Sequence, residues 1–199
     1  MHFLENSVDH TGKRGSIEVI AGSMFSGKTE ELIRRLKRAR IAGLNVEIYK
    51  PAVDTRYSDT FVVSHDERTI TSTPVDTASM ILLLSADAEV IGIDEAQFFD
   101  DGIVEVCNEL ANRGMRVIVA GLDMDFSGEP FGPVPEIMAV AEYITKVHAI
   151  CVECGNLANY SYRKTGNRNV VMLGEQELYK PLCRSCFNKY SESKGENEN

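Results

Sequence analysis

Residues 22–29 read Gly22-Ser23-Met24-Phe25-Ser26-Gly27-Lys28-Thr29 and match the phosphate-loop pattern G-x-x-x-x-G-K-T at every position. The glycines let the backbone curl so that its N–H groups point at phosphate oxygens. Lys28 adds positive charge, and Thr29 offers a hydroxyl to Mg²⁺. Such a loop lies between a strand and a helix. β-Branched residues enrich segment 16–21, and apolar residues recur at helical spacing over residues 30–42. The stretch therefore predicts a nucleotide-binding strand, loop and helix, in preference to a glycine-rich turn that binds nothing.

The composition is that of a globular protein with one main domain and a small appendage. Of the 199 residues, 43% are hydrophobic and 26% are charged. The formal net charge of −9 argues against sequence-independent binding to nucleic acid, which relies on basic surface. The sequence has no apolar run of about 18 residues, and its first residues lack the apolar core of a signal peptide. We therefore expect a cytoplasmic protein with no nucleic-acid or membrane partner.

Apolar segments and helical patterns alternate along most of the chain. This order predicts an α/β fold, a phosphate-loop parallel sheet with flanking helices of the RecA-like kind, with a small C-terminal zinc-binding domain. The predicted strands cover residues 46–50, 89–93, 116–121 and 144–150, and the predicted helices cover 77–84, 100–113 and 135–141. Composition divides the chain into a flexible arm (1–15), a nucleotide-binding domain (16–150), a cysteine-containing domain (151–187) and a disordered polar tail (188–199).

Two acids follow the apolar strand at residues 89–93, and they supply the partner that a phosphate loop needs. Ligands of such sheets bind outside the carboxyl ends of the strands, so Asp94 is expected beside Thr29, where both would hold Mg²⁺. Glu95 lies one residue further on, points elsewhere and is free to act as a base. Two alternatives remain from spacing alone: the acids could be helix caps or solvated charges, and many ATPases use the same pair to activate water.

The cysteines form two C-x-x-C pairs, Cys151 with Cys154 and Cys183 with Cys186. Four cysteines complete the tetrahedral set that a structural Zn²⁺ prefers and leave no position for water. The alternatives are redox pairs or accidental cysteines. The 28 residues between the pairs would form a long loop stapled at its base, and loops of this length are usually functional.

These motifs together resemble the zinc-containing, tetrameric thymidine kinases, the cytosolic type that also occurs in bacteria. The resemblance covers residues 16–187, and Ser23 departs from it because the family often has proline there. It implies transfer of phosphate from ATP to the 5′-hydroxyl of thymidine, with deoxyuridine a possible second substrate. It further implies Mg²⁺, a structural zinc ion, a homotetramer and feedback inhibition by thymidine triphosphate. The motifs are Gly22 to Thr29, Asp54-Thr55-Arg56, Asp94-Glu95-Ala96-Gln97-Phe98-Phe99, Gly121-Leu122-Asp123, Phe131-Gly132 and the cysteine pairs.

The resemblance also implies roles for single residues. Glu95 matches the base that accepts the proton of the 5′-hydroxyl, and Arg56 matches an arginine near the transferring phosphate, although a loop salt bridge is its alternative. Lys28 completes the catalytic set. The nucleotide is held by the phosphate loop and by Asp94, Glu95, Ala96 and Gln97. A lasso loop reads the base, largely through its backbone, and the matching nucleoside-binding residues are Met24, Phe98, Leu122, Phe126, Ser161, Val170, Val171, Met172, Leu173, Gly174 and Tyr179. For Phe98 and Phe126, packing in the core is the alternative.

Two other functions fit part of the pattern. A phosphate-loop ATPase with a nucleic-acid-binding zinc module would use the basic stretch at residues 34–40, although a solvated helix face is the preferred interpretation of that stretch. A nucleotide-dependent assembly protein without catalysis would not need Lys28, Thr29, Asp94 and Glu95 all to be intact.

Overall fold

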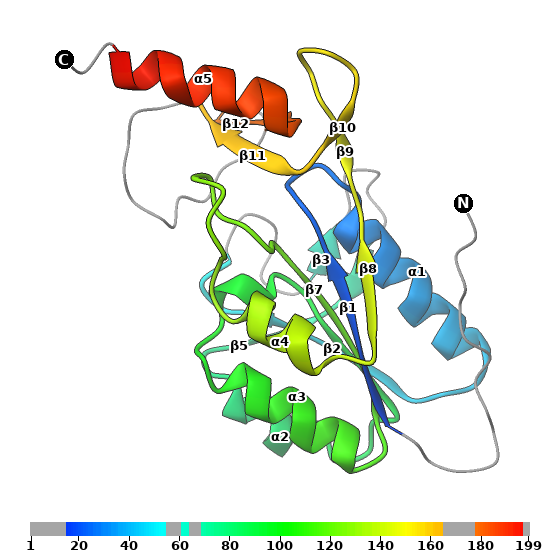
Figure 1. The fold of residues 1–199 in the computed structure, drawn as a ribbon. Coiled ribbons are helices and arrows are strands. Elements are labelled where there is room, and N and C mark those ends of the chain that lie inside the picture. The colour runs from blue at the N-terminus through cyan, green and yellow to red at the C-terminus, as the bar shows by residue number, and fades with distance from the viewer. Residues whose placement is uncertain (1–14, 55–60, 64–68, 165–177, 197–199) are drawn as a thin grey trace.

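The fold is built on a parallel sheet of six strands in the order β5-β2-β6-β7-β1-β8 (Figure 1). The computed structural model describes residues 15–54, 61–63, 69–164 and 178–196. Neighbouring strands end at similar heights: Ala21 of β1 pairs with Gly121 of β7, and Ile93 of β6 pairs with Tyr49 of β2. The carboxyl ends therefore form one edge, where ligands of such sheets bind. The strands, in chain order, are β1 Ser16–Ala21, β2 Val46–Pro51, β5 Thr73–Val75, β6 Val90–Ile93, β7 Arg116–Gly121 and β8 Tyr143–Lys146.

Helices cover both faces of this sheet, which confirms the predicted fold class. Helix α1 packs on one face through Leu32 and Leu36, and the helices at residues 79–84, 103–112 and 134–140 pack on the opposite face. The predicted core helices are all present, with ends within three residues of the expected ones. They are α1 Lys28–Ile41, α2 Ser79–Leu84, α3 Ile103–Asn112 and α4 Val134–Val140; a 3₁₀ turn, η1 Ala96–Phe98, lies between β6 and α3. Two short strands, β3 Phe61–Val63 and β4 Thr69–Thr71, pair separately.

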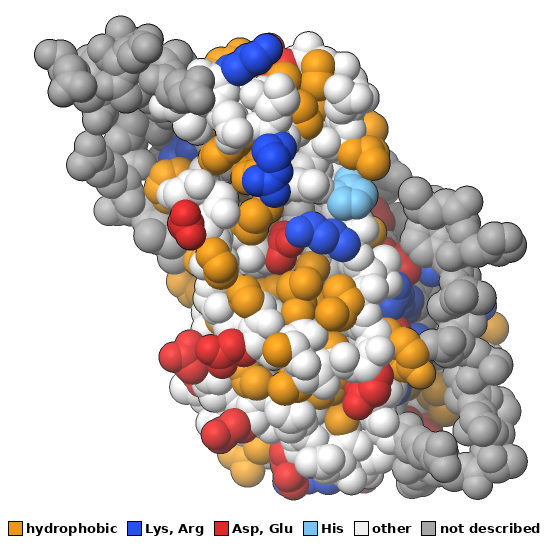
Figure 2. All heavy atoms as spheres, viewed as in Figure 1, with side chains coloured by type: hydrophobic (Ala, Val, Ile, Leu, Met, Phe, Trp, Pro, Cys, Tyr) orange, Lys and Arg blue, Asp and Glu red, His pale blue; other side chains and the backbone are white. Residues whose placement is uncertain are grey.

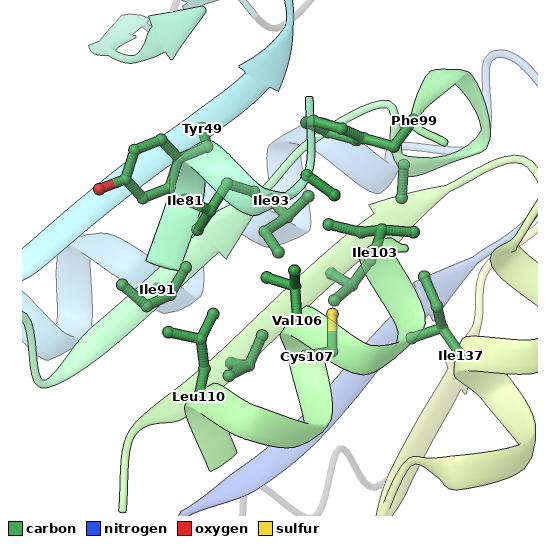
Figure 3. Close-up of a cluster of buried hydrophobic side chains, with 14 of the residues drawn as sticks. Tyr49, Ile81, Ile91, Ile93, Phe99, Ile103, Val106, Cys107, Leu110 and Ile137 are labelled. Atoms are coloured by element: carbon green, nitrogen blue, oxygen red, sulfur yellow. The ribbon is translucent and has the colours of Figure 1, made fainter. Parts of the chain in front are cut away.

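Alternation along the strands explains the two layers of the core. On β1, Ile17, Val19 and Ala21 face the helices α2 to α4, whereas Ile20 faces α1. Figure 3 shows the first of these layers, in which side chains of α3 meet those of the sheet and of α2. Cys107 lies inside it and is fully buried. Burial raises the pKa of its thiol to about 12, which keeps it unreactive.

A buried ionic network ties α1 to the sheet. Arg35 donates to Glu18 of β1 at 2.8 Å, to Glu31 at 2.8 Å and to the hydroxyl of Thr145 on β8 at 2.9 Å. Glu18 also accepts hydrogen bonds from Arg116 of β7. A solvated face is therefore the wrong interpretation for Arg35, because the strand acid opposite the helix draws this arginine inward.

A smaller C-terminal unit lies beyond the carboxyl edge of the sheet, above the phosphate loop (Figure 1). It consists of two hairpin-like pairs and a helix: β9 Ala149–Ile150 with β10 Leu157–Ala158, β11 Tyr160–Arg163 with β12 Tyr179–Leu182, and α5 Arg184–Glu196. The strand predicted at residues 144–150 is therefore two strands in two sheets, because the chain leaves the main sheet after Lys146.

Helix α5 corrects the prediction of a disordered tail from residue 188. The helix continues to Glu196. Its side chains make contacts that composition did not reveal: Phe187 is buried, and Tyr190 packs against the same cluster, with Lys180 Nζ 3.6 Å from the centre of its ring. These contacts order a segment whose overall polarity suggested no ordered structure.

Among all the described residues, no helix is both long and apolar enough to cross a membrane.

Candidate active site

The phosphate loop connects β1 to α1, as the sequence predicts. Gly22 has no room for a side chain, because a Cβ atom there would lie 2.2 Å from the carbonyl oxygen of Val147. Gly27 adopts a left-handed conformation with φ 84° directly before the helix. Lys28 is buried, and its Nζ donates to the carbonyl of Ser23 at 2.8 Å. The loop thus curls around the amine of Lys28, next to the positive end of the helix dipole.

Thr29 and Asp94 meet across the edge of the sheet. Thr29 Oγ1 lies 3.3 Å from Asp94 Oδ2, and Asp94 directly follows β6. Burial is the main cause that raises the pKa of Asp94 to about 7, and the negative charge of Glu95 is the second. The positive charge of Lys28 acts in the opposite direction and lowers this pKa. Asp54, which follows β2 in the chain, is also buried, and its negative charge raises the pKa of Asp94 further. Acids therefore gather around the one buried lysine of the phosphate loop.

This pair of oxygens fits a magnesium ion. Adjacent ligands of octahedral Mg²⁺ at about 2.1 Å from the metal are about 3 Å apart, close to the separation of the two atoms. A cation would also relieve the burial of several negative charges in one place. The residues present are therefore compatible with the metal.

Glu95 has an unusual backbone conformation, and its carboxylate is bonded to Gln97. Its φ of 51° is left-handed, a conformation that costs a residue with a side chain of order 1 kcal/mol or more. The backbone N–H of Glu95 donates to Asp94 Oδ1 at 3.0 Å, which fixes the turn between the two acids. Among the described non-glycine residues, the only other positive φ is at Phe25 of the phosphate loop. Strain thus occurs at the two segments that the sequence predicts to bind nucleotide.

The side chain of Gln97 is bonded at both ends. Its Nε2 donates to Glu95 Oε2, and its Oε1 accepts from the backbone N–H of Leu122 at 2.9 Å. Ala96, also predicted to bind nucleotide, is fully buried in the core cluster, so only its backbone remains for such a contact.

Four of the predicted nucleoside-binding side chains are half-buried at this edge: Met24, Phe98, Leu122 and Phe126. Leu122 is joined to Glu95 through Gln97, and the backbone N–H of Met24 donates to Ser161 Oγ at 3.0 Å. Phe98 meets Phe131 edge to face, with ring centres 5.9 Å apart. Of these four residues, Met24 is therefore the one that the structure joins to Ser161 of the C-terminal unit.

Sequence reasoning missed Arg163. This side chain is 2% exposed, and its guanidinium carbon lies 3.8 Å from the centre of the Phe126 ring. Its Nη2 donates to the hydroxyl of Tyr179 at 2.8 Å. Arg163 therefore covers one face of Phe126 and links the two strands that flank residues 164–178. A charged residue at the end of a strand, directly before a loop, is usually solvated. Nothing in the local sequence therefore indicated that Arg163 is buried.

Six predicted site residues lie outside the described part of the chain, and their roles stay predictions. They are Arg56 and the lasso-loop residues Val170, Val171, Met172, Leu173 and Gly174.

The four paired cysteines converge in the C-terminal unit. The Sγ atoms of Cys151, Cys154, Cys183 and Cys186 all lie within 4.8 Å of one another. Tetrahedral zinc at about 2.3 Å from each sulfur requires sulfur separations of about 3.8 Å, which this cluster can supply with small shifts. Although desolvation opposes it, hydrogen bonds from backbone N–H groups lower the pKa of Cys151 to about 6, and a thiolate is what a metal needs. The cluster could therefore bind zinc.

The C-terminal unit and the phosphate loop are in direct contact. Besides the bond from Met24 to Ser161, Ser23 Oγ donates to the carbonyl of Ala158 at 3.3 Å. Phe25 packs against the cluster in which Tyr160 stacks on Phe187, with ring centres 4.4 Å apart. The predicted boundary at residue 150 thus separates two units that share one interface, and the phosphate loop is part of it.

The structure weakens the nucleic-acid alternative. Within the basic stretch at residues 34–40, Arg35 is buried in the network with Glu18, and Arg34 pairs with Glu31 at 2.7 Å. On the face shown in Figure 2, the described basic side chains are scattered among acidic and apolar ones. Counterion release needs several basic groups along one path, so neither feature favours such binding.

Comparison with known proteins agrees with this geometry. The thymidine kinase family profile matches residues 15–187. A thymidine kinase of Bacteroides thetaiotaomicron is 60% identical over 185 residues, 93% of each chain. One of Porphyromonas gingivalis is 60% identical over 188 residues, covering 94% of this chain and 92% of its own. One of a Rhodothermus species is 61% identical over 178 residues, 89% and 84% of the two chains. The chain belongs to the thymidine kinase family.

Proposed function

We propose that this protein transfers the γ-phosphate of ATP to the 5′-hydroxyl of thymidine, with Glu95 as the general base. The observation that carries the proposal is the separation of two neighbouring acids. Asp94 lies at Thr29, whereas the carboxylate of Glu95, a residue with a left-handed backbone, is bonded to Gln97. One acid can then serve the metal and the other the nucleophile, as transfer to a hydroxyl requires.

Charge on the triphosphate is neutralised by the phosphate loop. The amine of Lys28 lies at the carbonyl of Ser23, and α1 begins at Lys28 itself, so the amine and the positive end of the helix would act on the same phosphates. Thr29 and Asp94 would hold Mg²⁺, which supplies further neutralisation of the phosphate oxygens when it is bound. Arg56, in this proposal, adds a guanidinium near the transferring phosphate.

Glu95 orients the nucleoside hydroxyl and accepts its proton. Phosphoryl transfer depends mainly on positioning and on electrostatics, so the base acts by holding the hydroxyl in line with the leaving group. General-base catalysis of this kind contributes about 10²- to 10⁴-fold to the rate.

Thymidine would bind between the main domain and the C-terminal unit. Met24, Leu122, Phe98 and Phe126 offer half-buried apolar surface there, and the residues of the lasso loop would read the base through their backbone. A pocket distinguishes one methyl group by roughly 1–3 kcal/mol, so we expect deoxyuridine to be a poorer substrate and not an excluded one.

We also propose a homotetramer with feedback inhibition by thymidine triphosphate, as the family resemblance implies. The edge strand β8 supports an interface, since Tyr143 and Ile144 are exposed apolar side chains on an unpaired sheet edge. Light scattering after gel filtration measures the assembly, and inhibition assays with thymidine triphosphate measure the regulation.

A kinase assay across nucleosides tests the proposed function. With ATP and Mg²⁺, thymidine should yield thymidine monophosphate, deoxyuridine should react more slowly, and purine nucleosides should not react. ATP consumption that is equal with and without any nucleoside would contradict the proposal.

A further inference from the structure

We propose that Gln97 is a positioning residue that holds the carboxylate of Glu95 in its reactive orientation and links it to the backbone of Leu122. The inference rests on the proposed function, in which Glu95 is the base. It differs from the nucleotide contact that the resemblance suggests for Gln97, because the amide of this side chain is bonded to the protein at both ends.

The two hydrogen bonds of Gln97 have opposite directions, and its amide group can make both at once. Nε2 donates to Glu95 Oε2, and Oε1 accepts from Leu122 N at 2.9 Å. A carboxylate at position 97 could accept from Leu122 but could not donate to Glu95. The backbone of Leu122 leads directly to a predicted nucleoside-binding side chain. The amide therefore joins the base to the pocket that would hold its substrate.

Packing fixes Gln97 so that it can impose an orientation. The residue is 4% exposed. Two glycines make room for it: a Cβ atom at Gly121 would lie 3.2 Å from Gln97 Oε1, and one at Gly132 would lie 2.6 Å from the Gln97 carbonyl oxygen. Side chains at either position would push against the turn that carries Gln97. The turn is therefore enclosed by close-fitting backbone and is a rigid support.

Glu95 needs such a support. Its carboxylate is reached through three rotatable bonds from a half-buried, left-handed residue, and a free glutamate would sample several rotamers. A misplacement of about 1 Å can cost about 10²-fold in rate. Gln97 restricts this freedom before the substrate arrives. The expected effect of losing it is therefore on turnover more than on binding.

The test is a double-mutant cycle between Gln97→Glu and Glu95→Gln, measured as kcat and KM for thymidine and ATP. Gln97→Glu keeps the acceptor toward Leu122 and nearly the same volume, and it replaces the amide donor toward Glu95 by a second carboxyl group. We expect it to lower kcat about 100-fold with both KM values within about 3-fold of wild type. In the Glu95→Gln background the same change should cost less than about 3-fold, because the residue acts only through the base.

Two further variants keep the test decisive. Asn108→Asp makes the same amide-to-acid change on α3, where Asn108 donates to the carbonyl of Val104 at 3.2 Å, and should leave kcat unchanged. Gln97→Met removes both hydrogen bonds and is used if Gln97→Glu lowers the melting temperature. It should show the same lack of additivity with Glu95→Gln.

The outcomes separate the inference from the proposed function. If the wild type makes no thymidine monophosphate, the proposed function fails and the inference fails with it. If the wild type is active and the Gln97 variants lower kcat by the same factor in both backgrounds, the inference alone is overturned. A large rise in the KM for ATP at unchanged kcat would instead support a nucleotide contact and would also overturn it.

Discussion

The main sheet and the C-terminal unit are stabilised in different ways. The sheet is closed on both faces by helices, and its two apolar clusters include many fully buried side chains. The C-terminal unit has a small cluster, short strands and four converging cysteines. A unit with so little buried apolar surface needs a further source of stability, and a metal supplies one. The phosphate loop belongs to the stable sheet but contacts the unit that depends on the cysteines.

Removal of zinc should have the largest effect and should separate the two regions. Structural zinc sites contribute about 10–16 kcal/mol of apparent binding free energy, so the C-terminal unit should lose its structure while the sheet keeps its own. Hydrogen exchange after chelation should report fast exchange over residues 149–163 and 179–190 and continued protection in β1, β6 and β7. Because Ser23 and Met24 bond to the C-terminal unit, ATP affinity should fall together with thymidine affinity. Loss of thymidine affinity alone would argue that the contact is unimportant.

A cavity in the main sheet should have the opposite pattern. Leu110 of α3 is fully buried, and Leu110→Ala should lower the free energy of unfolding by about 2–5 kcal/mol. KM and kcat below the melting temperature should stay close to wild type, because α3 packs on the side of the sheet opposite to α1. Urea denaturation and steady-state kinetics measure the two quantities. A changed KM would mean that the rigid sheet transmits packing changes to the site.

Asp94→Asn should stabilise the protein while it abolishes activity. Burial raises the pKa of Asp94 to about 7, above its unfolded value near 4, so the folded state pays for an ionised carboxylate at high pH. In the wild type, this destabilisation is complete above pH 7 and fades as the pH falls toward 4. Without Mg²⁺, the variant should therefore have the higher melting temperature at pH 8, and the difference should disappear near pH 4. A variant that is less stable at pH 8 would contradict the burial argument.

Loss of one hydrogen bond between the regions should have the smallest effect. Ser161→Ala leaves the N–H of Met24 without its acceptor, which costs about 0.5–1.5 kcal/mol. We expect a rise of up to about tenfold in the KM values with kcat nearly unchanged. Ser191→Ala is the matched control, because Ser191 Oγ bonds to the carbonyl of Phe187 within α5, at 3.0 Å. Equal effects of the two variants would show that the contact with the phosphate loop has no special role.

The sequence predicted the features that depend on local pattern. The alternation of strands and helices, the glycines of the phosphate loop, the acids after β6 and the paired cysteines each follow from residue types at short spacing. Those patterns predicted the strands of the sheet and the polar side chains at its carboxyl edge.

Contacts between distant segments could not be predicted in this way. The bond from Gln97 to Leu122 spans 25 positions, and that from Met24 to Ser161 spans 137. The sequence around Tyr190 and Arg163 did not indicate burial, because their aromatic partners, Tyr162 and Phe126, come from distant segments. Periodicity describes the face of one element and carries no information about which distant element will cover it. The helix after residue 187 was missed for that reason.

The most direct measurement compares wild type and Glu95→Gln for thymidine monophosphate formation, with ATP and thymidine binding measured by calorimetry on the same samples. The account predicts that wild type forms product only when thymidine is present. It predicts that the variant binds both substrates with nearly unchanged affinity and turns over about 10²- to 10⁴-fold more slowly. A variant with kcat within a few-fold of wild type would contradict the central claim that Asp94 and Glu95 divide the work between the triphosphate and the hydroxyl.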